Sequence, residues 1–169
     1  MWPLFYRGVE SGAIKVITRK IASSDIDLIC RHREMMFSEA GRNPDDLLAM
    51  AGPFKDWLGP RLDNGTYFGF VIEDEGRAVA AVGLMEIDWP PHPLHPTEPR
   101  RGYVFNVYVE PGYRRRGIAQ QLMQAAEQEF TARGIGYLIL HATTAGRPIY
   151  ERNGWVATSE MAKVLSIKS

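Results

Sequence analysis

The chain has 169 residues, the size of a single domain that can bury an ordinary core. Its composition, 45% hydrophobic and 24% charged, is typical of a globular protein and excludes a disordered one. Lys and Arg together number 20, as do Asp and Glu, so the formal net charge is zero. This balance argues against a nucleic-acid binder, and any anion site has to come from local clustering.

Cysteine content and hydropathy restrict the remaining classes of protein. Cys30 is the only cysteine, which excludes an internal disulfide and a cysteine-based zinc site. No apolar run approaches about 18 residues, so we expect no membrane-spanning helix. The opening residues 1–7 lack the basic-then-apolar order of a signal peptide, and we expect a cytoplasmic protein.

The N-terminal third is predicted to form one strand and two helices. Residues 14–19 alternate between apolar and polar side chains, as a half-buried strand does. Ser24 can cap the helix that follows, and Gly41 is a suitable stop for it. The Asn43-Pro44 pair predicts the start of a second helix, which we expect Gly52-Pro53 to interrupt.

The middle of the chain is predicted to be β-sheet. Two strand-like runs, 66–73 and 77–88, flank the hairpin signal Asp74-Glu75-Gly76. Residues 88–101 hold five prolines and are expected to form a long loop, because proline lacks the N–H group that a ladder needs. A third strand-like run follows at 103–109.

The C-terminal third alternates between helix and strand. Apolar residues recur at helical spacing over 118–130, and a strand is expected over 137–142. A short helix over 148–153 and a final hairpin over 155–164 complete the order, which predicts an α/β fold with a mixed sheet. The domain boundaries that follow are residues 1–13 for a lead-in and residues 14–169 for a single domain.

The turn after the third β run is the most informative stretch. The first turn of a helix leaves backbone N–H groups unpaired, and the helix dipole adds positive potential there. Gly117 has no Cβ and Ala119 is nearly as small, so a phosphate can approach the backbone closely. Three consecutive arginines, 114–116, would oppose the dipole unless an anion sits among them. The turn therefore predicts a pyrophosphate cradle, although it matches neither the P-loop nor the dinucleotide fingerprint.

Two stretches of the chain carry a resemblance to a known family. Residues 114–119 read Arg-Arg-Arg-Gly-Ile-Ala after a Val-x-Val-x-Pro strand end, and residues 150–155 read Tyr-Glu-Arg-Asn-Gly-Trp. These stretches resemble motif A (Arg/Gln-x-x-Gly-x-Gly/Ala) and the end of motif B (Tyr-x-x-x-Gly-Phe) of the GNAT superfamily of acetyl-CoA-dependent N-acetyltransferases. With the element order from Ile14 to Val164, the resemblance covers nearly the whole chain. It implies one GNAT-like domain, with a mixed and splayed sheet flanked by helices.

The resemblance also implies which residues would hold acetyl-CoA. In the family, the strand before the turn is splayed from its neighbour and its backbone groups pair with the pantetheine arm, as an amide-bearing chain can at an open edge. The positions that match are Val107, Tyr108 and Val109. The residues that would surround the pyrophosphate are Arg114, Arg115, Arg116, Gly117, Ile118, Ala119 and Gln120. Thr143 stands where many relatives have Asn or Ser, and it is a further candidate contact of the arm.

Tyr150 matches the family's general-acid tyrosine, which can protonate or stabilise the CoA thiolate as it leaves. The base that takes the proton of the amine is open. Glu86 and Glu110 are candidates because they lie near the predicted cleft, and a water chain can serve instead. His92 and His95 are spaced H-x-x-H but lack further ligands, so we expect no metal. His141 is expected to be a strand residue without chemistry.

The resemblance predicts acetyl transfer from acetyl-CoA to an amine by direct attack in a ternary complex. The acceptor is a small molecule or a peptide N-terminus, walled by roughly residues 35–62 and 88–101. The alternative is a non-catalytic acyl-CoA-binding or sensor domain, against which Tyr150 argues. A nucleic-acid or membrane partner is not expected. Many relatives are dimers, so a homodimer is compatible with the resemblance.

Overall fold

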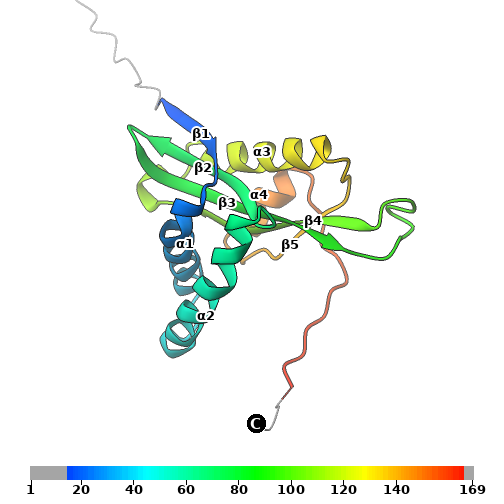
Figure 1. Cartoon of the computed structure of the whole chain (residues 1–169), viewed down its shortest axis with the longest axis horizontal. Helices are drawn as coiled ribbons and strands as arrows, with labels where there is room; N and C mark the ends of the chain where they lie inside the picture. Colours follow the sequence, from blue (N-terminus) through cyan, green and yellow to red (C-terminus); the bar gives the residue numbers. More distant parts are fainter. Residues whose placement is uncertain (1–14, 166–169) are drawn as a thin grey trace, which may run out of the picture.

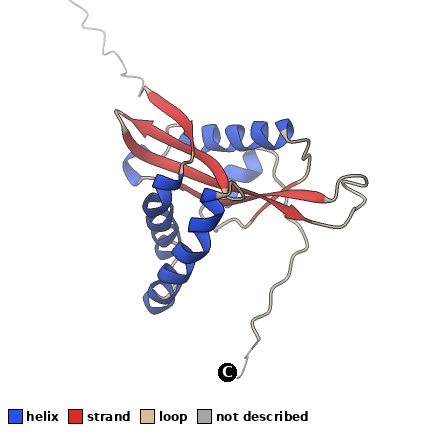
Figure 2. Cartoon of the chain, viewed as in Figure 1, coloured by secondary structure: helices blue, strands red, loops and turns tan. Residues whose placement is uncertain are grey.

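The computed structural model describes residues 15–165, so the lead-in over residues 1–13 lies outside the described residues. A central sheet has helices on both of its faces (Figures 1 and 2). The strands are β1 (Val16–Lys20), β2 (Phe68–Asp74), β3 (Arg77–Asp88), β4 (Arg100–Val109) and β5 (Leu138–Leu140). The α-helices are α1 (Ile26–Glu39), α2 (Pro44–Asp63), α3 (Ile118–Ala132) and α4 (Arg147–Arg152), with short 3-10 turns at Ser23–Asp25 and Pro111–Tyr113.

The sheet is mixed, as the sequence predicts. Its strands lie in the order β1-β2-β3-β4-β5, and every neighbouring pair is antiparallel except β4 and β5, which are parallel. At the β2–β3 hairpin, Glu75 and Gly76 have φ of 48° and 79°. Positive φ at both central residues is the geometry of a tight two-residue hairpin turn. The expected loop between the third and fourth strands is also present, because the chain forms no strand between Asp88 and Arg100.

The second helix starts as predicted but does not break where expected. The Asn43 side chain accepts a hydrogen bond from Asp45 N at 2.8 Å, which confirms the cap. The interruption predicted at Gly52-Pro53 is wrong, because α2 continues through it to Asp63. A proline removes one helical hydrogen bond, and here the loss is offset because Leu58 and Leu62 of the same helix are buried.

The two faces of the sheet bury two separate cores. The larger core lies between the sheet and α3, where Leu122, Met123 and Phe130 are 0–1% exposed. The smaller core lies under α1 and α2, where Ile29 and Tyr67 are each 2% exposed. Because neighbouring strand residues point to opposite faces, β3 and β4 supply side chains to both cores.

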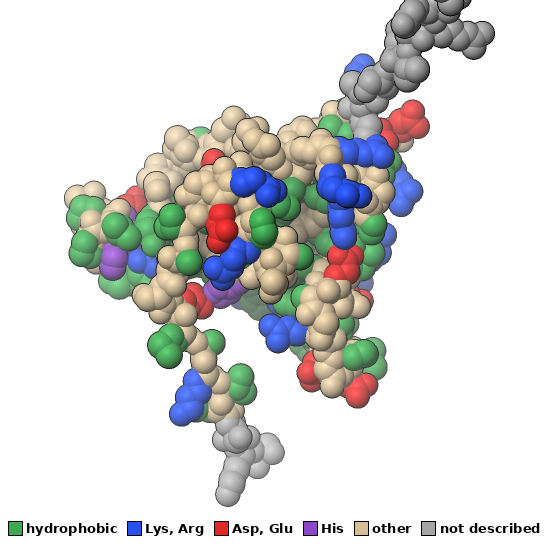
Figure 3. All heavy atoms as spheres, turned by 180° about the vertical axis from the view of Figure 1, so that it is seen from behind, with side chains coloured by type: hydrophobic (Ala, Val, Ile, Leu, Met, Phe, Trp, Pro, Cys, Tyr) green, Lys and Arg blue, Asp and Glu red, His purple; other side chains and the backbone are tan. Residues whose placement is uncertain are grey.

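The final hairpin predicted over 155–164 is wrong. The described residues after α4 form no strand, and those from Val156 onward are exposed. This C-terminal segment leaves the body of the molecule as a single extended chain with apolar side chains along it (Figures 1 and 3). A strand forms only where its backbone groups find a ladder partner, and this segment has none within residues 15–165. Among residues 15–165, no helix is long and apolar enough to span a bilayer.

Candidate active site

β4 and β5 pair over only three residues and then separate. The register ends with Val104 opposite Leu140, whereas β4 continues to Val109. Residues 105–109 therefore have no partner on the β5 side among the strands that the structure describes. Such an edge presents N–H and C=O groups to which an extended amide-bearing ligand can pair, although Val109 O already accepts a hydrogen bond from Arg114. The gap contains the three positions, Val107, Tyr108 and Val109, that the resemblance assigns to the pantetheine arm.

A β-bulge in β4 bends the strand within this gap. Phe105 pairs with Gly83 and Tyr108 pairs with Ala81, so two residues of β4 face one residue of β3. One of these two, Asn106, has φ of 47°, a left-handed conformation that Asn tolerates better than most residues. The bulge places the side chains of both Phe105 and Asn106 toward α1 and α2, where Asn106 is 7% exposed.

The free edge of β4 leads directly to the N-terminus of α3. The first hydrogen bond of this helix runs from Gln121 N to Gly117 O at 3.0 Å, so the N–H groups of residues 118–120 precede it and lack an intrahelical acceptor. Gly117 has φ of 79°, and a Cβ built on it would meet no atom within 4 Å. The cradle therefore combines open space with backbone donors and the positive end of a helix dipole, as an anion site requires.

The three arginines of the turn have different surroundings. Arg114 is held by the protein itself: its Nη2 lies 2.8 Å from Glu39 Oε2, and its Nε donates to Val109 O at 2.9 Å. The Glu39 partner raises the pKa of Arg114. Arg116 lies over the ring of Tyr113 at 5.6 Å, and it is exposed together with Arg115. The positive charge at the cradle that is available to an anion thus comes from Arg115 and Arg116.

The Tyr108 side chain points away from the gap, toward α1. Its hydroxyl donates to Glu39 Oε1 at 2.8 Å, and its ring lies 4.8 Å from that of His32. Burial, together with this hydrogen bond, raises the pKa of Tyr108 to about 12. The Tyr108 side chain is therefore not available to a ligand in the gap.

Tyr150 lies on α4, on the same side of the sheet as α3. It packs against the larger core, with its ring 6.3 Å from that of Trp155 in an edge-to-face arrangement. Burial raises the pKa of Tyr150 to about 12, so the phenol stays protonated at neutral pH. Just before this helix, the Thr143 hydroxyl accepts a hydrogen bond from Gly146 N at 3.1 Å, which engages the Thr143 side chain in holding the turn.

The contacts of Glu86 argue against its expected role as the base. Its two carboxylate oxygens accept hydrogen bonds from Arg133 at 2.9 Å and from Arg100 at 2.8 Å. The Arg133 bond, followed by the Arg100 bond, lowers the pKa of Glu86. A carboxylate that is stabilised in its charged form takes up a proton less readily. Arg133 follows the C-terminus of α3, so Glu86 also lies at the end of that helix opposite to the cradle.

Glu110, the second candidate for the base, is buried beneath α1. It is 8% exposed, and its Oε1 lies 3.1 Å from Arg31 Nη2 and 3.4 Å from His32 Nε2. Burial lowers the pKa of His32, so the neutral imidazole is favoured. This group packs α1 against the end of β4 and does not face the gap.

A buried polar network, which local sequence patterns do not predict, lies at the bulge. Arg33 Nη1 donates to Asn106 Oδ1 at 2.8 Å, and Asn106 Nδ2 donates to the Tyr67 hydroxyl at 2.9 Å. The guanidinium of Arg33 also lies over the rings of Phe37 and Phe54, at 4.8 and 4.5 Å. The Asn within an otherwise apolar strand was a signal of the bulge, whereas nothing in the sequence pairs it with Arg33.

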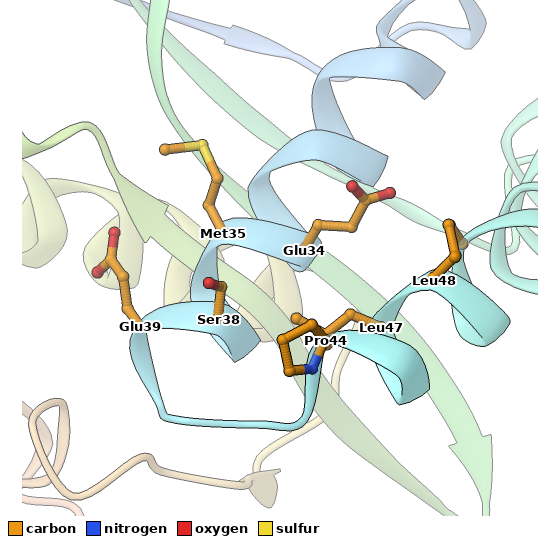
Figure 4. A pocket seen from close by; sticks show the side chains of 8 residues that line it. Glu34, Met35, Ser38, Glu39, Pro44, Leu47 and Leu48 are labelled. Carbon is orange, nitrogen blue, oxygen red and sulfur yellow. The ribbon is translucent and has the colours of Figure 1, made fainter.

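A groove of about 480 Å³ lies between α1 and α2 (Figure 4). It falls largely within residues 35–62, which were expected to wall the acceptor. Figure 4 shows the Glu34 carboxylate on one side of the groove, across from the apolar side chains of Leu47 and Leu48. Glu39, the partner of Arg114, also lines it, so the groove extends toward the cradle.

The two loop histidines are used for structure. Arg101 Nε donates to His95 Nε2 at 2.9 Å, so the other ring nitrogen of His95 donates to Glu98 O, also at 2.9 Å. The ring of His92 stacks on that of His95 at 5.6 Å. Within residues 15–165, no group of three or more His, Cys, Asp or Glu side chains could hold a metal ion.

Comparison with known proteins identifies the family. The model of the acetyltransferase (GNAT) family matches residues 29–155. A GCN5-related N-acetyltransferase from Ralstonia eutropha JMP134 is 53% identical, with a TM-score of 0.88 over 89% of this chain and 98% of that one. This protein belongs to the GNAT acetyltransferase family. A search of curated proteins found no match.

Two further solved structures have the same fold. A predicted acetyltransferase from Clostridium acetobutylicum, solved with acetyl-CoA, is 27% identical, with a TM-score of 0.80 over 89% of this chain and 96% of that one. A ribosomal-protein-alanine N-acetyltransferase from Brucella melitensis is 20% identical, with a TM-score of 0.62 over 90% of this chain and 99% of that one. The family uses acetyl-CoA, and the cradle at α3 has the open space and the unpaired N–H groups that a pyrophosphate needs.

Proposed function

We propose that this protein transfers the acetyl group of acetyl-CoA to a primary amine, by direct attack of the amine on the thioester while both are bound. The observation that supports this most directly is that the free edge of β4, residues 105–109, leads into the N-terminus of α3. The edge offers backbone partners for the amides of the pantetheine arm, and residues 115–120 offer donors for the pyrophosphate. Holding both reactants together supplies a large part of the rate through proximity.

On this proposal Tyr150 assists the departure of the thiolate. Its pKa of about 12 keeps the hydroxyl protonated and therefore able to donate. A thiol is a stronger acid, with a pKa of about 8.5 for cysteine, so complete proton transfer from Tyr150 to the sulfur is uphill. We therefore assign to Tyr150 a hydrogen bond to the sulfur that strengthens as the C–S bond breaks and negative charge develops.

The acceptor is proposed to be a cationic amine, either a small molecule or a peptide N-terminus. The groove between α1 and α2 supports a cationic partner, because the Glu34 carboxylate lies across the groove from its apolar wall. Proteins of known structure with this fold include acetyltransferases of ribosomal-protein alanine and of aminoglycosides. Those proteins are at most 20% identical to this chain. Their substrates therefore serve as candidate amines for a screen and do not assign the acceptor of this protein.

The test is CoA thiol release from acetyl-CoA with spermidine, kanamycin, free lysine and an alanine-initiated peptide, one at a time. Amine-dependent thiol release, with one acetyl group added to the amine by mass spectrometry, would support the proposal. Thermal stabilisation by CoA without thiol release from any amine would favour an acyl-CoA-binding or sensor domain. Absence of stabilisation well above micromolar CoA would contradict both.

Substitution Tyr150→Phe removes the proposed donor and keeps the ring. We expect kcat to fall about 100-fold, because one donor to the developing charge is lost. The affinity for CoA, measured by calorimetry, should change less than twofold, since the cradle and the β4 edge are intact. Tyr137→Phe, on a tyrosine that packs against His95 at 5.1 Å, is the matched control and should keep kcat. Equal turnover of Tyr150→Phe and wild type would contradict the role of Tyr150.

A further inference from the structure

Three side chains form a hydrogen-bonded chain at the point where β4 and β5 separate. The Tyr103 hydroxyl oxygen lies 2.6 Å from Nδ1 of His141, and Nε2 of His141 lies 2.8 Å from Oε1 of Glu160. Tyr103 belongs to β4, His141 directly follows β5, and Glu160 belongs to the C-terminal segment. Side chains from three separate parts of the chain therefore meet in one line of hydrogen bonds.

The chemistry of the three groups sets the direction of these bonds. An ionised carboxylate can only accept a hydrogen bond. The Nε2 of His141 therefore carries a hydrogen and donates a hydrogen bond to Glu160. The neutral imidazole then has a lone pair on Nδ1, which accepts the hydrogen bond from the Tyr103 hydroxyl. In this arrangement Glu160 stabilises the imidazolium that would form if Nδ1 took up a proton.

These three hydrogen-bonded side chains lie near the expected position of the acetyl group of bound acetyl-CoA. The pyrophosphate is proposed to bind at α3, beyond Val109, so an arm that follows the β4 edge points its thioester back toward Phe105. The gap closes at the pair Val104–Leu140, and Tyr103 and His141 immediately flank that pair. The Tyr103 ring stacks on that of Phe105 at 4.1 Å, so it lies on the α1 and α2 face, opposite to Tyr150.

We propose that Tyr103, His141 and Glu160 form the proton relay that deprotonates the acceptor amine, an inference that rests on the proposed function. The Tyr103 oxygen takes a proton from the bound ammonium while its own proton passes to His141 Nδ1. The amine nitrogen regains its lone pair and forms the C–N bond as the C–S bond breaks. The proton removed from the ammonium ends on His141, whose imidazolium is paired with Glu160. The second proton, which the nitrogen loses on becoming an amide, passes to the departing thiolate, so the products are the acetylated amine and the CoA thiol.

The surroundings of the relay agree with this role. The side chains of His141 and Glu160 are 63% and 57% exposed, so the imidazolium can return its proton to water after each turnover. Burial raises the pKa of Tyr103, which disfavours a lasting phenolate, so the two proton transfers at its oxygen have to occur together. Tyr103 is the catalytic residue of this relay, and Glu160 is a positioning residue that acts through His141.

The test uses the full-length protein, acetyl-CoA and the best acceptor from the amine screen. Variant His141→Ala should lower kcat/KM for the amine about 100-fold and change the affinity for CoA less than twofold. Added imidazole should restore a measurable part of the lost rate in His141→Ala but should not change the rate of Tyr103→Phe. His92→Gln, which removes a histidine from the proline-rich loop, is the matched control and should keep the wild-type rate.

A second measurement separates a relay from a structural contact. Either substitution breaks the same proton path. Tyr103→Phe, His141→Ala and the double variant should therefore lose similar factors in kcat/KM for the amine. Losses that multiply in the double variant, or a His141→Ala rate within twofold of wild type, would overturn the relay. Either result would leave the proposed function intact, because that depends on amine-dependent thiol release by the wild type.

Discussion

At the scale of single residues, Tyr67 connects the smaller core to the bulge of the active-site strand. Its side chain is buried between α2 and the sheet, and its hydroxyl accepts the hydrogen bond from Asn106. Burial raises the pKa of Tyr67 well above its ordinary value. The hydroxyl fits only because residue 83 on β3 is glycine: a Cβ there would lie 1.8 Å from the Tyr67 oxygen.

Substitution Gly83→Ala should therefore destabilise the protein by about 1–3 kcal/mol, since Tyr67 must move and the Asn106 bond is disturbed. Urea unfolding measures the loss. Gly136→Ala is the matched control, because its Cβ would meet no atom within 4 Å and its φ is not positive. The control should change stability by less than about 0.5 kcal/mol. If both variants are equally stable, the packing of Tyr67 against Gly83 does not limit the fold.

At the scale of elements, one ion pair fastens the start of α1 to the edge of the sheet. Arg19 of β1 donates two hydrogen bonds to the carboxylate of Asp25, at 2.7 and 2.8 Å. The same carboxylate accepts from Ala22 N at 2.8 Å, and Arg19 also bonds Glu73 of β2 at 2.7 Å. The Arg19 bond, together with the backbone bond from Ala22, lowers the pKa of Asp25. The pair therefore joins β1, β2 and the entry to α1.

The pair makes a pH-dependent contribution to stability. The pKa of Asp25 is lower in the folded than in the unfolded chain, so its contribution is fully present above the ordinary aspartate value of about 3.9. It is lost as the pH falls through the lower folded value. We expect Asp25→Asn to cost about 1–3 kcal/mol near pH 7, and the difference from wild type to shrink below pH 4.

Urea unfolding at pH 7, 5 and 3 measures this effect. Asp27→Asn is the matched control, because the Asp27 side chain is 81% exposed and its pair with Lys55 lies at the surface. Surface ion pairs contribute little to stability, so the free energy of unfolding of Asp27→Asn should stay within about 0.5 kcal/mol of wild type at each pH. A difference between Asp25→Asn and wild type that stays constant down to pH 3 would refute the titration of Asp25.

At the scale of the whole molecule, local patterns predicted most of the architecture. The β2–β3 hairpin, the Asn43 cap and the turn into α3 each depend on neighbouring residues, whose periodicity and turn chemistry are visible in the sequence. The features that failed depend on distant partners. The tail beyond Gly154 has strand-like residues but no ladder partner within residues 15–165, and packing of α2 outweighs Pro53.

The candidate site likewise has a part that is visible in the local sequence and a part that is not. The cradle could be predicted because it is one continuous turn, whereas the surroundings of each charged group could not. Nothing local pairs Arg114 with Glu39 or Glu86 with Arg133, which lie far apart in the chain. The neutral total charge also conceals this pairing: one of the three arginines at the cradle is compensated by α1, which leaves Arg115 and Arg116 for an anion.

Binding at the cradle should stabilise the entire domain, because a ligand that binds only the folded state shifts global unfolding. CoA at about 100 times its dissociation constant should add about 2.7 kcal/mol and raise Tm by about 5–10 °C. Gly117→Ala should reduce this shift and also lower Tm without CoA, since its φ of 79° costs an L-residue about 1–2 kcal/mol. A Cβ at this position would also occupy space that the pyrophosphate is proposed to approach.

Differential scanning fluorimetry with and without CoA separates the two effects, because the shift is taken relative to each variant's own Tm. Gly112 lies in the same turn, has no positive φ, and a Cβ built on it would lie in open space. Gly112→Ala should therefore keep both the wild-type Tm without CoA and the wild-type shift in Tm with CoA. A Gly117→Ala protein that is destabilised but has the full CoA shift would show that Gly117 serves the turn alone. In that case the pyrophosphate would have to lie away from this part of the backbone.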